Sequence, residues 1–143
     1  MTVKAILSRK GSDVVTIAPT ANLSEAVKLL AERRIGAVIV TGADNRVAGI
    51  LSERDIVRAL GERGAGALGD NIAAVMTRKV TTCVEADTVA DIMERMTTGK
   101  FRHVPVVEQG RLAGVISIGD VVKFRVEEIE RESDALREYI ATA

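Results

Sequence analysis

Two short polar motifs follow apolar segments, and their residue types suit the binding of a nucleotide. Ser52-x-x-Asp55 comes directly after Val47–Leu51, and Ser117-x-x-Asp120 comes after Leu112–Ile116. A helix that begins after each Ser would point its first backbone N–H groups at a bound anion. The Asp carboxylate can accept hydrogen bonds from both hydroxyls of a ribose, while the Ser hydroxyl and the helix amides face a phosphate. The alternative interpretation is a capping box that only closes the helix end.

The basic residues near these motifs differ between the two halves of the chain. The second half carries Lys100, Arg102 and His103 beside an apolar segment. The corresponding positions of the first half are Arg34, Gly36 and Ala37. Conversely, Arg54 lies inside the first motif, where the second has Gly119. We therefore expect two chemically unequal pockets, with a phosphate preferring one of them. The alternative for each single Lys or Arg is a solvated surface charge.

Two other patterns suggest chemistry that their context does not support. Gly64–Gly69 spells G-x-G-x-x-G, but it follows a predicted helix instead of a strand, so we expect a flexible linker. Cys83 and His103 could pair as nucleophile and base, yet Cys83 matches Ile17 of the first half, which predicts a small buried side chain. One Cys and one His cannot build a structural zinc site. We predict neither catalytic nor metal-binding residues.

An internal duplication positions the two motifs. Gly49-Ile50-Leu51-Ser52 reappears as Gly114-Val115-Ile116-Ser117, and the lead-in Ala5–Lys10 resembles Ala74–Lys79. Each copy predicts the order strand, helix, strand, strand, helix. In the first copy these elements are Val14–Ile17, a helix through Leu23 and Leu30, Ala37–Val40, Val47–Leu51 and a helix after Ser52. In the second they are Val80–Val84, a helix from Val89 to Met96, His103–Val107, Leu112–Ile116 and a helix after Ser117.

Local signals predict how these elements begin and turn. Asn22 and Asp87 are the expected caps of the two amphipathic helices. Asp44-Asn45 and Gln109-Gly110 predict the turns of the two hairpins.

The last helix extends well past the end of the repeat. Its apolar positions step by four and three residues along a charged sequence: Val122, Val126, Ile129, Ser133, Leu136 and Ile140, with Ser133 as the polar exception. We expect this face to contact a partner, and we expect the chain to form a two-fold homodimer. The alternative is a surface helix packed on its own domain.

Composition narrows the class of protein. The 143 residues include 20 Lys or Arg and 20 Asp or Glu, and 47% are hydrophobic, which is enough for a real core. Balanced charge and only three aromatic side chains argue against binding of nucleic acid. No apolar segment approaches the roughly 18 residues of a membrane span, and no signal peptide is recognisable. We therefore expect a cytoplasmic protein with no membrane contact.

At the quoted residues the sequence resembles the CBS domain, a module of about 60 residues named after cystathionine beta-synthase that occurs in tandem pairs. The most specific matches are Gly49–Asp55, Gly114–Asp120, Arg102–Val107 and Val75-Met76-Thr77. The resemblance implies an α/β fold of two CBS repeats with pseudo-two-fold symmetry and an extended C-terminal helix. The expected repeats are 1–72, with the lead-in and linker, and 73–143, with the C-terminal helix.

The resemblance also implies a ligand and the residues that would hold it. Such pairs bind adenine nucleotides or other adenosyl compounds between their repeats, with AMP as the first candidate and ADP, ATP, NAD(H) or S-adenosylmethionine as others. The expected ligand-binding residues are Thr16, Ile35, Gly36, Ala37, Ser52, Arg54, Asp55, Thr82, Lys100, Phe101, Arg102, His103, Pro105, Ser117 and Asp120.

Our first hypothesis is a stand-alone regulatory module that binds an adenosyl ligand and signals to a separate effector protein. The alternative is a structural homodimeric adaptor with vestigial pockets. We do not expect an enzyme, because no nucleophile, base and orienting group converge in the sequence.

Overall fold

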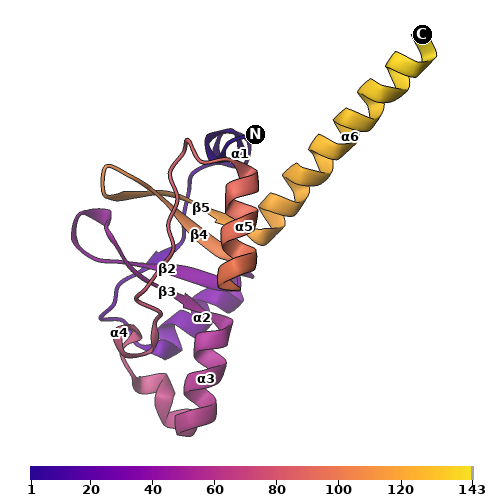
Figure 1. The fold of residues 1–143 in the computed structure, drawn as a ribbon. Helices are drawn as coiled ribbons and strands as arrows, with labels where there is room; N and C mark the ends of the chain where they lie inside the picture. Colours follow the sequence, from indigo (N-terminus) through magenta and orange to yellow (C-terminus); the bar gives the residue numbers. More distant parts are fainter. Residues whose placement is uncertain (143) are drawn as a thin grey trace.

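The computed structural model describes residues 1–142, which form two similar halves (Figure 1). The first half follows the predicted element order, and the second follows it except for its first strand. The first half contains α1 (Val3–Lys10), β1 (Thr16–Ile17), α2 (Leu23–Arg33), β2 (Ala37–Thr41), η1 (Ala43–Asn45), β3 (Val47–Ser52), α3 (Glu53–Arg63) and η2 (Gly64–Gly69). The second contains α4 (Ile72–Val75), α5 (Val89–Gly99), β4 (His103–Glu108), β5 (Arg111–Ser117) and α6 (Ile118–Thr142).

Each half contains the predicted antiparallel hairpin. Strand β2 pairs with β3, and β4 pairs with β5, so that Ala37 lies opposite Ser52 and His103 opposite Ser117. The second hairpin turns at Gln109-Gly110, where both residues adopt a positive φ that a tight turn of this kind requires. Strand β1 extends the first sheet by pairing with β2 in parallel. The two motif serines therefore lie at the ends of equivalent strands.

The predicted strand Val80–Val84 is wrong in its extent. Only Cys83 pairs with β4, through its N–H to the Pro105 carbonyl at 3.0 Å and its carbonyl to the Val107 N–H at 2.9 Å. The chain leaves the sheet directly afterwards. The next two backbone N–H groups donate to carboxylate side chains and not to a neighbouring strand. The Val84 N–H donates to Asp87, and the Glu85 N–H donates to Glu108.

One of the two predicted helix caps is confirmed. The Asn22 side chain accepts the Glu25 N–H at 2.9 Å at the start of α2. The prediction for Asp87 is wrong, because Thr88 caps α5 in a reciprocal capping box with Asp91. Asp87 instead binds the Val84 N–H and the guanidinium of Arg95 at 2.8 Å.

The segment Gly64–Gly69 is not the flexible linker that we expected. It forms the 3₁₀ helix η2, and the methyl group of Ala67 is fully buried in the core of the first half. The Ala67 carbonyl accepts the Asp70 N–H at 3.0 Å, and the Asp70 carbonyl accepts the Leu23 N–H at 2.8 Å. Burial of one small side chain and this chain of hydrogen bonds fix the segment against α2.

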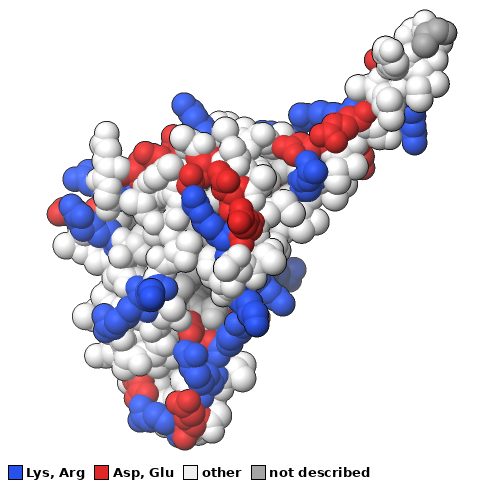
Figure 2. Space-filling model, viewed as in Figure 1, with Lys and Arg blue, Asp and Glu red and all other residues white. Residues whose placement is uncertain are grey.

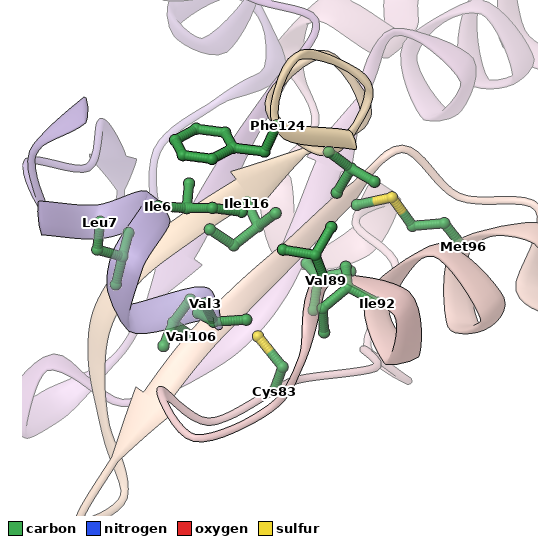
Figure 3. Packing of buried hydrophobic residues seen from close by; sticks show 12 residues of the cluster. Val3, Ile6, Leu7, Cys83, Val89, Ile92, Met96, Val106, Ile116 and Phe124 are labelled. Atoms are coloured by element: carbon green, nitrogen blue, oxygen red, sulfur yellow. The ribbon is translucent and has the colours of Figure 1, made fainter. Parts of the chain in front are cut away.

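The two lead-in helices pack crosswise. Val3, Ile6 and Leu7 of α1 belong to the core of the second half, beside β5 and α5 (Figure 3). Ile72 of α4 and the following Met76 belong to the core of the first half. Each core therefore contains the lead-in of the other copy, and this exchange joins the two halves into one unit. The boundaries of the sequence repeat remain a prediction.

A glycine in each hairpin makes room for this crosswise packing. A Cβ at Gly49 would lie 2.7 Å from both the Met76 sulfur and the Thr77 carbonyl oxygen, and a Cβ at Gly114 would lie 2.7 Å from the Leu7 side chain. Real Cβ contacts are longer, so the lead-ins can approach the strands only where a side chain is missing.

Cys83 is buried in the second core, with 3% of its surface exposed, as predicted. Burial and the nearby Asp87 carboxylate raise the pKa of its thiol to about 12, so the reactive thiolate is scarce at neutral pH.

Helix α6 leaves the body of the molecule after its first turns. Val121 and Phe124 anchor it in the second core, whereas its carboxyl-terminal half projects outward (Figures 1 and 3). The alternative of a helix packed along its own domain is therefore wrong for this half. Among residues 1–142 no helix combines the length and the apolar character that crossing a bilayer requires.

Candidate functional site

A cavity of about 540 Å³ opens between the two halves, at the junction of β3 and α3. Segments from both halves line it: the start of α3, the lead-in after α4, and the turn between α5 and β4. Eight of the expected ligand-binding residues lie there: Gly36, Ser52, Arg54, Asp55, Lys100, Phe101, Arg102 and His103. A volume of this size is within the range of small-molecule sites.

Asp55 lies at the base of this cavity, with its hydrogen-bonding capacity already in use. Its Oδ2 accepts from the Ser52 N–H at 3.0 Å and from the Ser52 hydroxyl at 3.1 Å, while the Ser52 hydroxyl accepts the Asp55 N–H. Its Oδ1 accepts from Arg58 at 2.7 Å and from the Thr77 hydroxyl at 3.0 Å. The motif is thus a capping box, and a ribose could reach this carboxylate only by replacing donors on Oδ1.

The cavity carries an excess of positive charge. Its lining includes five basic side chains, Arg54, Arg58, Lys79, Lys100 and Arg102, against the two acids Glu53 and Asp55. Figure 2 shows Lys and Arg side chains on both sides of the middle of the molecule. We expected Arg54 in one pocket and Arg102-His103 in another, which is wrong. The crosswise packing brings both groups to the same cavity, and Arg54 donates to the Lys100 carbonyl at 3.4 Å.

The sequence did not point to the rest of the lining, apart from Thr81, which lies in a segment expected beside the adenine. The missed residues are Ile50, Glu53, Arg58, Thr77, Lys79, Val80 and Gly99. A signal for Thr77 and Lys79 was present in the sequence. The lead-in Ala74–Lys79 repeats Ala5–Lys10, and these two residues match Ser8 and Lys10. Arg58 could have been found from helical spacing, since it lies one turn after Asp55 on α3.

The aspartate of the second motif is paired with a lysine of the first lead-in. Lys10 Nζ lies 2.6 Å from Asp120 Oδ2 and 2.8 Å from the Val115 carbonyl oxygen. The Ser117 N–H and hydroxyl bind the same Asp120 oxygen at 2.9 and 3.0 Å. Burial raises the pKa of Asp120, but the hydrogen bonds from Lys10 and Ser117 and the charge of Lys10 outweigh it, so the pKa lies below its ordinary value. A ligand at this carboxylate would compete with Lys10.

Five further expected residues are not part of the lining of the cavity. Thr16 and Thr82 are exposed, Ile35 and Ala37 are half-buried, and Pro105 is buried at the position where Cys83 pairs with β4. None of these five lines the 540 Å³ cavity. Their role in ligand binding stays a prediction.

His103 lines the cavity at the start of β4. Burial lowers its pKa, and so do the charges of Lys10 and Arg102, although Asp120 and Glu53 act in the opposite direction. Its imidazole is therefore neutral at pH 7 and adds a hydrogen-bonding group, not a further cation, to the site.

Comparison with known proteins places this architecture among related chains. The CBS domain profile matches residues 3–62 and 72–127. The chain is 33% identical over 111 residues to an uncharacterised 17.7 kDa protein of Acidianus ambivalens, covering 77% of this chain and 66% of that protein. It is 33% identical over 120 residues to the mitochondrial CBS domain-containing protein CBSX3 of Arabidopsis thaliana, covering 81% and 58%. The chain thus spans about two thirds or less of these relatives.

Solved structures resemble it over most of its length. The CBS-domain containing protein ATU1752 from Agrobacterium tumefaciens has a TM-score of 0.83 and 52% identity, covering 87% of this chain and 92% of that one. The CBS domain protein PAE2072 from Pyrobaculum aerophilum, complexed with AMP, has a TM-score of 0.74 and 31% identity, covering 84% of this chain and 89% of that one. The CBS domain pair of MJ0100, in complex with 5′-methylthioadenosine and S-adenosyl-L-methionine, has a TM-score of 0.79 and 26% identity, covering 90% of this chain and 98% of that one.

Proposed function

We propose that this chain, which belongs to the CBS domain family, is a regulatory module that binds an adenine nucleotide in the cavity at Asp55. AMP is the first candidate, and ADP, ATP and NAD(H) share the same adenosyl and phosphate groups. The module has no catalytic role of its own and transmits the presence of the ligand to a separate effector protein.

The charge of the cavity is the observation that carries this proposal. Five basic side chains around one opening favour a ligand with a phosphate, because charge-assisted hydrogen bonds from Lys and Arg to phosphate are strong. The basic lining favours a nucleotide over adenosine. The complexes of PAE2072 with AMP and of the MJ0100 pair with adenosyl compounds support an adenosyl ligand in this fold.

The lining suggests how a nucleotide would be oriented. The ribose hydroxyls would donate to Asp55 Oδ1 in place of Arg58 and Thr77, while Ser52 continues to hold Oδ2. The displaced Arg58 would then be available to the phosphate. Apolar groups for the adenine come from lining residues such as Ile50 and Phe101.

We also propose that the module works as a homodimer. Apolar residues of α6 are exposed in the single chain, which favours a second protein surface against them. Light scattering at tens of micromolar tests this directly, because one chain has a mass of 15.3 kDa.

Thermal unfolding with a panel of ligands tests the proposed ligand class. A ligand that binds only the folded state must raise the melting temperature. We expect AMP, ADP or ATP at millimolar concentration to raise it by several degrees and adenosine to raise it less. An absence of any shift with these nucleotides, NADH and S-adenosylmethionine would reject the sensor function. The structural adaptor would then be the better account.

A further inference from the structure

The projecting half of α6 carries an apolar seam that faces away from the body of the molecule. Val122, Val126, Ile129, Leu136 and Ile140 are each about half exposed or more. Phe124, which anchors the helix in the core, points from the opposite side of α6. The whole seam is therefore available to another chain without any rearrangement of the fold.

Beyond Ile129 the helix has almost no support from its own chain. Every described residue from 129 to 142 is exposed except the half-buried Ser133. An isolated helical segment of about 14 residues is only marginally stable in water. A partner along the seam would supply the missing burial.

The spacing of the seam is that of a two-stranded coiled coil. Steps of four and three residues place Val126, Ser133 and Ile140 at a positions of the heptad and Val122, Ile129 and Leu136 at d positions. The flanking g and e positions then decide which orientation of two helices is favoured.

The charges at these flanking positions favour a parallel pair. In a parallel coiled coil each g residue lies near the e residue five positions later in the partner, so that Arg125 meets Glu130 and Glu132 meets Arg137. Both contacts join opposite charges. Within one chain Arg125 already pairs with Glu128 at 3.0 Å, and Arg137 lies 3.9 Å from Asp134. These are exposed pairs that can be shared or exchanged at little cost.

The antiparallel register that matches all six seam residues brings like charges together. It pairs Ile129 with Ser133 of the second chain and has its two-fold axis near Arg131. Glu130 and Glu132 would then face their own copies across this axis. Lys123 would face Arg137. Every charged pair that this arrangement forms at the seam is repulsive.

We infer that α6 pairs with α6 of a second copy as a parallel, in-register coiled coil, which orients the two modules side by side at one end of the helix pair. This inference rests on the proposed homodimer and adds its geometry. It does not depend on the ligand at the Asp55 cavity.

Cysteine cross-linking of the full chain tests the orientation. A cysteine replacing Ile140 lies next to its copy in the parallel pair, so Ile140→Cys should form a disulfide-linked dimer under mild oxidation. In the antiparallel register the two cysteines would be about 27 Å apart along the axis and could not join. Glu138→Cys, on the outer face, is the matched control and should stay unlinked. Cys83 does not compete, because it is buried.

A mixture of Val122→Cys and Ile140→Cys chains tests the opposite arrangement. A disulfide between the two variants, without Ile140→Cys self-linkage, would overturn the parallel orientation. A monomer in light scattering would instead reject the homodimer itself, so the two failures are distinguishable.

Charge reversal gives a second, independent measure. In the parallel pair Arg137→Glu faces Glu132, so the dissociation constant of the dimer should rise about tenfold. Adding Glu132→Arg to this variant should bring the constant back to the wild-type value. In the antiparallel pair Arg137→Glu would face Lys123 and tighten the dimer. Arg131→Glu makes the same charge change on the outer face and should leave the dissociation constant of the dimer nearly unaltered. Tightening by Arg137→Glu would contradict the proposal.

Discussion

Lys10 Nζ lies 2.6 Å from Asp120 Oδ2, whereas Lys79, at the matching position of the second lead-in, lines an open cavity beside Asp55. The difference arises from the lead-ins themselves. Helix α1 continues to Lys10, but α4 ends at Val75, and the following chain pairs Thr77 with Ile50 of β3. The aspartate of one motif is thereby paired with a lysine of a lead-in, whereas the aspartate of the other is paired with Arg58 of its own helix and borders the cavity.

This asymmetry predicts one nucleotide per chain. Lys10→Met removes the cation from Asp120 and should allow a second, weaker equivalent to bind, detected as a change of stoichiometry in calorimetry. Lys4→Met, on the same helix α1, is the matched control and should keep the wild-type stoichiometry. Two sites of equal affinity in the wild type would contradict this account of Lys10.

Substitution of the two motif aspartates should have unequal effects on binding. A hydrogen bond to a charged group contributes about 1.5–3 kcal/mol, so Asp55→Ala should weaken the nucleotide about ten- to a hundredfold. Asp120→Ala should leave the affinity nearly unchanged. Because Asp55 completes the capping box of α3 and binds Arg58 and Thr77, its variant should also lose folding free energy, and its folding must be checked by circular dichroism. Equal losses for both variants would refute the assignment of the open cavity.

The cations at the cavity should act on the phosphate. Arg102→Ala should weaken AMP several-fold more than adenosine, and added salt should reduce the difference. Arg111→Ala, on β5 and outside the lining, is the control. Equal losses for AMP and adenosine would show that Arg102 does not contact the phosphate.

The two hairpin glycines should differ in their tolerance of a methyl group. At Gly49 the new Cβ meets the Thr77 backbone, so Gly49→Ala should lower the free energy of unfolding by about 1–3 kcal/mol. At Gly114 it meets only the flexible end of Leu7, so Gly114→Ala should cost less. Gly42→Ala, which meets nothing, is the reference. Denaturant unfolding measures all three, and a larger loss for Gly114→Ala would contradict the packing described.

Folding stability should fall below about pH 6.5 through the only histidine. The folded state lowers the pKa of His103 from its ordinary value of 6.5. The unfolded chain therefore binds a proton first as the pH falls, and stability is lost from the ordinary pKa downward. Between pH 7.5 and 5.5 the carboxylates with lowered pKa values, such as Asp120, stay ionised. The free energy of unfolding should decrease over this interval in the wild type but much less in His103→Gln, and an equal decrease in both would exclude His103 as its source.

The repeat predicted the hairpins and the long helices because these elements are governed by local periodicity. The exchange of the lead-ins between the cores could not be predicted, since it depends on contacts far apart in sequence, such as Leu7 with Gly114. The same exchange explains why the cations were assigned to the wrong pockets. It packs the two halves so that Arg54 and Arg102 line one cavity. The pairing of Lys10 with Asp120 had no local signal, because the two lead-ins have similar residues and differ in where their helices end.

A crystal structure of the protein grown with AMP would show where the nucleotide binds. We expect one AMP per chain in the cavity between the halves, with its ribose hydroxyls at Asp55 and its phosphate near Arg102 and Lys100. AMP bound only at Asp120, or no AMP at a concentration that saturates the thermal shift, would contradict this expectation.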